Sequence, residues 1–126
     1  MSEYKIATLA GGVAGLTALS GLTTPVLDPV SFWQDFQEQV DLASQLVRGV
    51  GLPVAEWLFP VMSLAARSQL KSFCAGASAV VYLRTANNAG SYAIYKGVMV
   101  WPLQERCKAG MVFELTVKIK ALEVQS

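Results

Sequence analysis

The chain has 126 residues, of which 53% are hydrophobic and 15% are charged, and its net charge is +1. This length suits a single domain with one core, and the small net charge argues against a dedicated nucleic-acid binder, which usually carries a strong basic excess. The chain has no histidine, which excludes Ser-His-Asp and Cys-His nucleophile systems and imidazole metal sites.

The charged residues are divided unevenly along the chain. Residues 1–60 hold two bases and six acids, whereas residues 61–126 hold eight bases and three acids. Opposite halves of this kind suit head-to-tail contact between copies, although a sparse set of charges can also be uneven by chance. The two cysteines, Cys74 and Cys107, form no CxxC motif, and we expect both to be reduced thiols.

An uncharged apolar run covers residues 6–27 and is long enough to span a bilayer as a helix. Four glycines and Pro25 interrupt it, and each glycine costs up to about 1 kcal/mol in a helix relative to alanine. We therefore predict a first strand near Tyr4 to Leu9, followed by a flexible glycine-rich segment that packs on neighbours. The glycine-rich N-terminal arm as a whole is placed at residues 6–30. A small membrane protein anchored through residues 6–27 is the alternative.

The next segment is ambiguous between helix and strand. Phe32, Phe36, Val40 and Val47 fit helical spacing, yet the polar residues between Phe36 and Leu42 also give a strand-like alternation. Glycines and a proline follow at once, and these punctuate strands more often than helices. The prediction is a strand near 34–42, a turn near 43–47 and an extended segment through 59.

A short helix of about three turns is predicted to follow. Ser63 suits the N-cap position, Leu64, Leu70 and Phe73 lie broadly on one side, and Gly76 suits the end.

Residues 76–102 read as two strands joined by a turn, and neither face of this ribbon is clearly polar. Both faces carry aliphatic and aromatic residues, with Arg84 and Lys96 as the only charges. In a half-buried hairpin one face should be polar. We therefore expect both faces to lie against protein, which is the first indication of an assembly.

The last strand has the clearest pattern of all. One face is predicted to consist of alternate apolar residues, namely Met111, Phe113, Leu115, Val117, Ile119 and Ala121. Together the segments predict a mainly β protein of the α+β kind, a β-sandwich or open barrel with one short helix, in a single domain over residues 1–126.

No pattern in the sequence supports catalysis. The GGVAG stretch at 11–15 lacks the lysine of a phosphate loop. Glu105 and Glu114 could be imagined as a carboxylate pair, but Glu114 lies near Lys118 on a strand face, where an ion pair is the ordinary explanation. The tryptophans and tyrosines could stack on bases, yet few bases lie near them, so core or interface positions are favoured. We expect no enzyme activity, no cofactor and no metal.

Residues 49–122 show a recognisable layout. A Gly-Pro strand runs through a tryptophan to a short helix, then come VVYLRT, a Y-x-x-Y strand ending in M-x-W-P, and the alternating strand FELTVKIKAL. This layout resembles the tail tube (major tail) proteins of tailed bacteriophages. The resemblance implies a β-sandwich flanked by a helix, joined edge to edge into a hexameric ring, with rings stacked into a conduit for DNA. The N-terminal arm has no counterpart in this layout, and the chain is short for a tube subunit.

The resemblance implies a structural role in the virion tail, for a protein made in the host cytoplasm. Its partners would be further copies of itself, other tail proteins, and genomic DNA held only weakly in the lumen. A ribbon that is apolar on both faces could pack one face on its own core and the other on the next subunit. We expect the inter-subunit contacts at Tyr82, Tyr95, Met99 and Trp101. A neck or distal-tail ring protein is the alternative, and a monomeric binding module is a further one.

Overall fold

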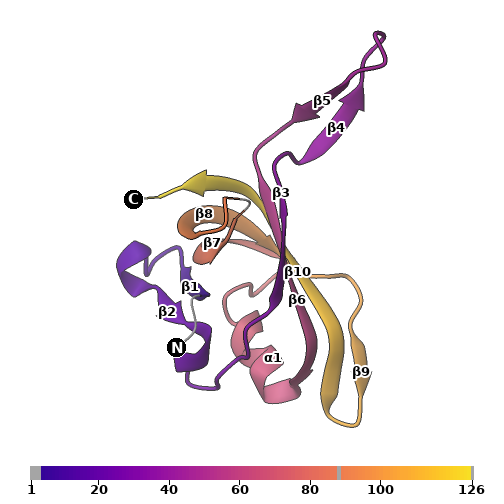
Figure 1. The fold of residues 1–126 in the computed structure, drawn as a ribbon. Helices are drawn as coiled ribbons and strands as arrows, with labels where there is room; N and C mark the ends of the chain where they lie inside the picture. The colour runs from indigo at the N-terminus through magenta and orange to yellow at the C-terminus, as the bar shows by residue number, and fades with distance from the viewer. Residues whose placement is uncertain (1–3, 88, 126) are drawn as a thin grey trace.

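A computed structural model describes residues 4–87 and 89–125, and it shows an antiparallel β protein with one α-helix in this part of the chain (Figure 1). The helix is α1, Leu64–Lys71. The strands are β1 Lys5–Thr8, β2 Thr17–Ala18, β3 Val30–Gln34, β4 Glu38–Asp41, β5 Val47–Val50, β6 Val54–Ser63, β7 Ser78–Ala86, β8 Tyr92–Val100, β9 Arg106–Lys108 and β10 Met111–Val124. The predicted fold class, mainly β with one short helix in a sandwich or open barrel, is confirmed.

Most of the strands form one curved sheet. Its order is β2-β1-β7-β8-β10-β6-β3, with β9 added beside the first residues of β10, whereas β4 and β5 pair only with each other. The long strand β10 lies at the centre because it pairs with β6 along most of its length and with β8 beyond Val117. The sheet therefore has β3 as one edge, and β4 and β5 stand apart from it.

The core lies on the inner face of this curved sheet. Trp57 of β6 is fully buried there, and its indole Nε1 donates a 2.9 Å hydrogen bond to Oγ1 of Thr85 on β7. The ring of Tyr4 meets that of Trp57 edge to face at 5.8 Å, and the Tyr4 hydroxyl lies 2.8 Å from Oγ of Ser31 on β3. Aromatic packing and these polar contacts therefore join Tyr4, just before β1, to β3, β6 and β7.

The alternation predicted for β10 holds in its middle and fails at both ends. Leu115, Val117 and Ile119 are buried as expected. Glu114 and Ala121, however, both have positive φ, 52° and 56°, and the pairing with β8 shifts register between Lys120 and Glu123. Each such kink turns the following side chains to the other face. Val112 and Leu122 consequently take core positions in place of the predicted Met111, Phe113 and Ala121.

The helix starts where the sequence predicts. Oγ of Ser63 accepts a 3.2 Å hydrogen bond from the backbone N–H of Ala66, which is the N-cap interaction. The helix then ends at Lys71, so it is shorter than the three turns expected. Its buried residues are Ala66 and Leu70, whereas Leu64 is 47% exposed.

The segment predicted as one strand over 34–42 consists of two strands. β3 ends at Gln34, whose side-chain Nε2 donates to the backbone oxygens of Phe36 and Gln37 at 2.6 and 2.9 Å. These bonds hold a bend, after which β4 begins at Glu38. The preference for strands over a helix is confirmed, but the expectation of a continuous strand is wrong.

The N-terminal segment packs on its own chain. β1 confirms the strand predicted near Tyr4 to Leu9, and it pairs with β7. The following residues contain β2 and two short 3-10 turns, Val13–Gly15 and Leu19–Gly21. Leu19 and Val26 are both buried in the core, so residues 6–30 are anchored to the body rather than forming a loose arm. Within the described residues, no helix has the length and apolar character to cross a membrane.

Candidate assembly surfaces

The β4–β5 hairpin projects away from the body of the molecule (Figure 1). Its strands pair with each other, Glu38 with Val50 and Asp41 with Val47, and with no other described strand. Every residue of both strands is exposed except Gly49. An isolated two-stranded hairpin is at best marginally stable in water, so this arm is a natural candidate for a surface that another chain covers.

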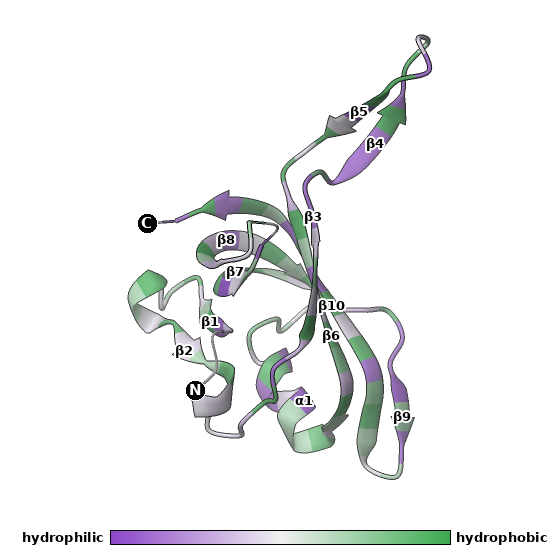
Figure 2. Cartoon of the chain, in the orientation of Figure 1, coloured by the Kyte–Doolittle hydropathy of each residue, from purple (hydrophilic) through white to green (hydrophobic). Residues whose placement is uncertain are grey.

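One face of the hairpin carries two exposed valines beside a glutamate and an arginine. Because side chains two apart in a strand share a face, Val40 and Val50 point to the same side, and the register adds Glu38 and Arg48 there. Val40 is 45% and Val50 37% exposed. Figure 2 shows hydrophobic colour on both strands of the arm, and Leu46 at its tip is 66% exposed. Water thus contacts a run of aliphatic groups that the chain itself leaves open.

The base of the hairpin is built more tightly than its tip. The ring of Phe36 lies against the backbone of Gly49, leaving no room for a Cβ at that position. Gly51 has φ +88°, and a Cβ there would lie 2.8 Å from Cβ of Gln37. Gly49 is therefore required by the close approach of the Phe36 ring, and Gly51 by its positive φ and the nearby Gln37.

A second open apolar surface lies on the outer face of the main sheet. The register pairs Val80 of β7 with Val98 of β8 on that face, and Ile94 and Val100 lie along the same side of β8. Val80 is 36% exposed, and the other three are partly exposed. We call Val80, Ile94, Val98 and Val100 the outer patch. Residues 76–102 were expected to lie against protein on both faces. The inner face packs on the core, whereas the outer face is left open in the single chain.

Basic side chains surround the outer patch. Lys96 lies between Ile94 and Val98 on β8, and Arg84 of β7 lies opposite Ile94. Lys118 and Lys120 lie beside the patch on β10, opposite Val100 and Val98. The acids on this face are Glu56, whose carboxylate lies 3.8 Å from Nζ of Lys118, and Glu123, opposite Lys96. Lys96 also lies 6.0 Å from the ring centre of Tyr82, and Arg84 lies 5.4 Å from that of Tyr92. The bases outnumber the acids, so the surface is apolar and positive.

The four predicted interface residues do not share one surface. Tyr82 lies on the outer face and is partly exposed. Tyr95, Met99 and Trp101 lie on the inner face, where they are 5%, 0% and 7% exposed. The register sets Tyr95 opposite Leu83 and Met99 opposite Ala79, both on the core side. Side chains already buried in one chain have almost no surface left for a neighbour, so the single chain does not support these three as inter-subunit contacts.

Glu105 and Glu114 do not form a carboxylate pair, and each binds a different arginine. Glu105 accepts two hydrogen bonds from Arg67 of α1, from Nε at 2.8 Å and from Nη2 at 2.7 Å. These bonds hold the pKa of Glu105 below its ordinary value and raise the pKa of Arg67. Arg67 also lies 5.4 Å from the ring centre of Trp101. Glu114 instead accepts from Arg106 at 2.7 Å, while the expected partner, Lys118, lies beside Glu56.

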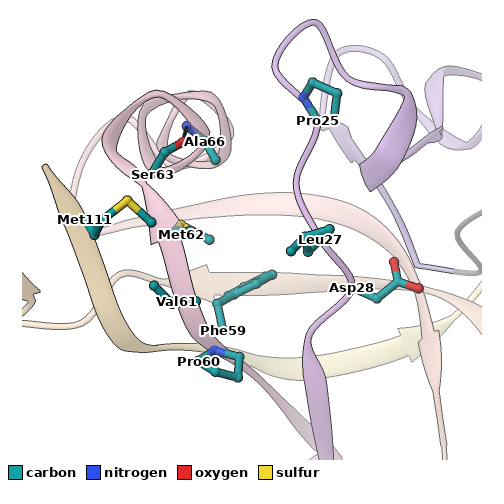
Figure 3. A pocket seen from close by; sticks show the side chains of 10 residues that line it. All are labelled: Pro25, Leu27, Asp28, Phe59, Pro60, Val61, Met62, Ser63, Ala66 and Met111. Atoms are coloured by element: carbon teal, nitrogen blue, oxygen red, sulfur yellow. Dashed lines mark hydrogen bonds between the residues drawn. The ribbon is translucent and has the colours of Figure 1, made fainter.

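A hollow of about 410 Å³ lies between the N-terminal segment, β6 and the start of α1 (Figure 3). Its lining is mostly apolar and includes Pro25, Leu27, Phe59, Met62 and Met111, with Asp28 as its one charged residue. Figure 3 shows the lining side chains around the hollow, contributed by the segment before β3, by β6, by α1 and by β10. Across residues 4–87 and 89–125, no group of three or more cysteines, aspartates and glutamates could hold a metal ion.

Comparison of the chain with models of protein families, with curated proteins and with solved structures finds no match. The assignment of a function therefore rests on the surfaces described above. The predicted turn near 43–47 and the extended segment after it are confirmed, because β4 and β5 pair around residues 42–46. The sequence does not predict that this hairpin projects from the main sheet. The cluster of Gly49, Gly51 and Pro53 after the turn is the one further signal at its base.

Proposed function

We propose that the protein is a structural subunit of a bacteriophage tail, and that its copies assemble into stacked rings forming the tube through which DNA passes. The observation that carries this proposal is the projecting β4–β5 hairpin, with its exposed aliphatic face. A small protein that exposes such an arm and also an open apolar sheet face has two surfaces to bury. Association between copies buries both.

The form of the sheet supports a ring. The strand β3 is an edge, and Val30 and Phe32 on it are each 51% exposed. Open edges template pairing with other chains unless they are covered. A contact between two different surfaces of the same chain closes into a ring when the rotation between copies allows it, and a hexamer is the arrangement proposed here.

The proposed role is passive toward DNA. With a net charge of +1, the subunit lacks the strong basic excess of proteins that hold DNA tightly. Weak binding lets DNA slide along a lumen. The protein would be made in the host cytoplasm and reside in the virion tail, beside other tail proteins.

Negative-stain microscopy of the purified protein tests this proposal. We expect rings with a central channel, alone or stacked into tubes. Isolated rings that never stack would favour a neck or distal-tail ring instead. Featureless single particles of monomer size would contradict the proposal, and co-purification with lipid vesicles would favour the membrane alternative.

A further inference from the structure

We propose that the face of the β4–β5 hairpin that carries Val40 and Val50 docks, in one copy, on the outer patch of the next copy. The inference rests on the proposed function, which requires copies to associate, and it names the two surfaces that meet. Both surfaces are present on every chain and they differ from each other. The contact is therefore heterologous, the kind that generates rings or filaments.

The first argument is apolar complementarity. The hairpin offers Val40, Val50 and Leu46, between 37% and 66% exposed. The outer patch offers Val80, Ile94, Val98 and Val100, all on one side of β7 and β8. Each is a sheet face with side chains two residues apart, and two such faces can pack with their side chains interdigitated. Burial stabilises by roughly 25 cal/mol for each Å² of apolar surface removed from water.

The second argument is charge. The arm from Asp35 to Leu52 carries three acids, Asp35, Glu38 and Asp41, against one base, Arg48. Around the outer patch the balance is reversed, with Arg84, Lys96, Lys118 and Lys120 against Glu56 and Glu123. The net negative charge of the arm steers its encounter with this positive surface. The register places Asp41 on the opposite face and sets Glu38 on the same face as Arg48, so the charges guide the approach and the aliphatic residues select the face. The excess of acids in residues 1–60 and of bases in residues 61–126 thus corresponds to an acidic arm and a basic sheet face.

A third argument concerns the position of the arm relative to its own sheet. The base of the arm, at Gln37 and Glu38, lines a hollow together with Val100, Lys118 and Lys120 of the same chain. The distal part of the arm, by contrast, points away from the body (Figure 1). The distal aliphatic residues therefore do not cover the chain's own outer patch, which leaves both surfaces available to neighbouring copies.

The test uses two full-length variants that each damage one surface. Val40→Asp places a charge on the docking face of the arm, and Val80→Asp places one in the outer patch. Gln39→Asp is the matched control, because Gln39 neighbours Val40 but points to the opposite face of the arm. Thermal melting first shows that each variant folds. We expect both docking-face variants to remain monomeric in sedimentation at concentrations where the wild type and Gln39→Asp assemble.

Mixing the two variants gives the sharper result. Val40→Asp retains an intact outer patch, and Val80→Asp retains an intact arm, so one good contact can form between them and none beyond it. We expect a one-to-one complex that grows no further. If Val40→Asp and Val80→Asp each assemble as the wild type does, this inference is overturned and the proposed function still stands. A wild type that stays monomeric would overturn the proposed function itself, and loss of assembly in Gln39→Asp as well would overturn the assignment of the docking face.

Discussion

Ile94 and Tyr95 are neighbours on β8, but their side chains lie on opposite faces of the sheet. Tyr95 is 5% exposed and packs in the core, where its ring centre lies 5.4 Å from that of Trp33 and its hydroxyl accepts a 3.1 Å hydrogen bond from Nδ2 of Asn87. Ile94 is partly exposed in the outer patch. Substitutions at Tyr95 therefore test the stability of the single chain, whereas substitutions at Ile94 test the association of several chains.

The same substitution at these two positions should have different consequences. Tyr95→Asp should lower the free energy of unfolding by more than about 3 kcal/mol, because it buries an unpaired charge. Ile94→Asp should lower it by no more than about 1 kcal/mol, since the site contacts water in the single chain, yet it should prevent association. Thermal melting and sedimentation measure the two effects. Unfolding by Ile94→Asp, or normal assembly of that variant, would contradict the proposed role of the outer patch.

The hydrogen bond between Trp57 and Thr85 predicts a sizeable stability effect in the core. Thr85→Val keeps the shape of the side chain but removes the acceptor, so the buried indole N–H loses its partner. The free energy of unfolding should fall by about 1–3 kcal/mol. Thr85→Ser retains the hydroxyl and serves as the control in denaturant titrations. A Thr85→Val protein as stable as the wild type would show that this bond contributes nothing net.

The ion pair of Glu105 with Arg67 predicts a dependence of stability on pH. Because the pKa of Glu105 is lowered in the folded chain, its stabilising contribution is present above the ordinary glutamate pKa of about 4.3 and is lost as pH falls through the lower folded value. Glu105→Gln should lower the free energy of unfolding at pH 7 by about 1–2 kcal/mol. It should also flatten the loss of stability below pH 5.

Glu114 provides the matched control for that experiment. Its ion pair with Arg106 is equally short, but the two side chains are 64% and 73% exposed, so Glu114→Gln should change stability by less than about 0.5 kcal/mol. Equal effects of the two substitutions across the acid range would contradict the account of Glu105.

Gly97 predicts a steric effect in the middle of β8. A Cβ at this position would lie 2.7 Å from Cδ2 of Leu122 and 2.8 Å from Cγ2 of Ile119. Gly97→Ala should therefore destabilise the protein by about 1–3 kcal/mol through overpacking. Gly76→Ala is the comparison, because nothing lies within 4 Å of a Cβ there. Comparable melting temperatures for the two variants would argue against close packing of β10 on β8.

Local patterns in the sequence predicted the parts of the fold that depend on local chemistry. Ser63 caps the helix as expected, because its hydroxyl oxygen accepts a hydrogen bond from the backbone N–H of Ala66 in the first turn. The alternation of β10 predicted a strand, but not that positive φ at Glu114 and Ala121 would exchange the faces at its ends. Those kinks depend on pairing with β6 and β8, which the sequence of one strand does not encode.

The candidate site was predicted less well, for a similar reason. The two-faced ribbon correctly indicated apolar residues on both sides, but deciding whether Tyr95 or Ile94 faces the core requires the register with β7 and β10. The sequence does not show that the arm projects, because the alternation of polar and apolar residues is the same whether a strand joins the main sheet or leaves it. Only the long-range pairing of β3 with β6, and the bend held by Gln34, separate the two cases.

Sedimentation velocity of the wild-type protein over a range of micromolar concentrations tests the central claim most directly. The claim is that the exposed arm and the outer patch exist to be buried between copies. The account predicts species much larger than the 13.5 kDa chain, in a pattern that grows with concentration and ends at a closed ring or a stacked polymer. A single monomeric boundary throughout the range, from protein with a cooperative thermal melt, would contradict it.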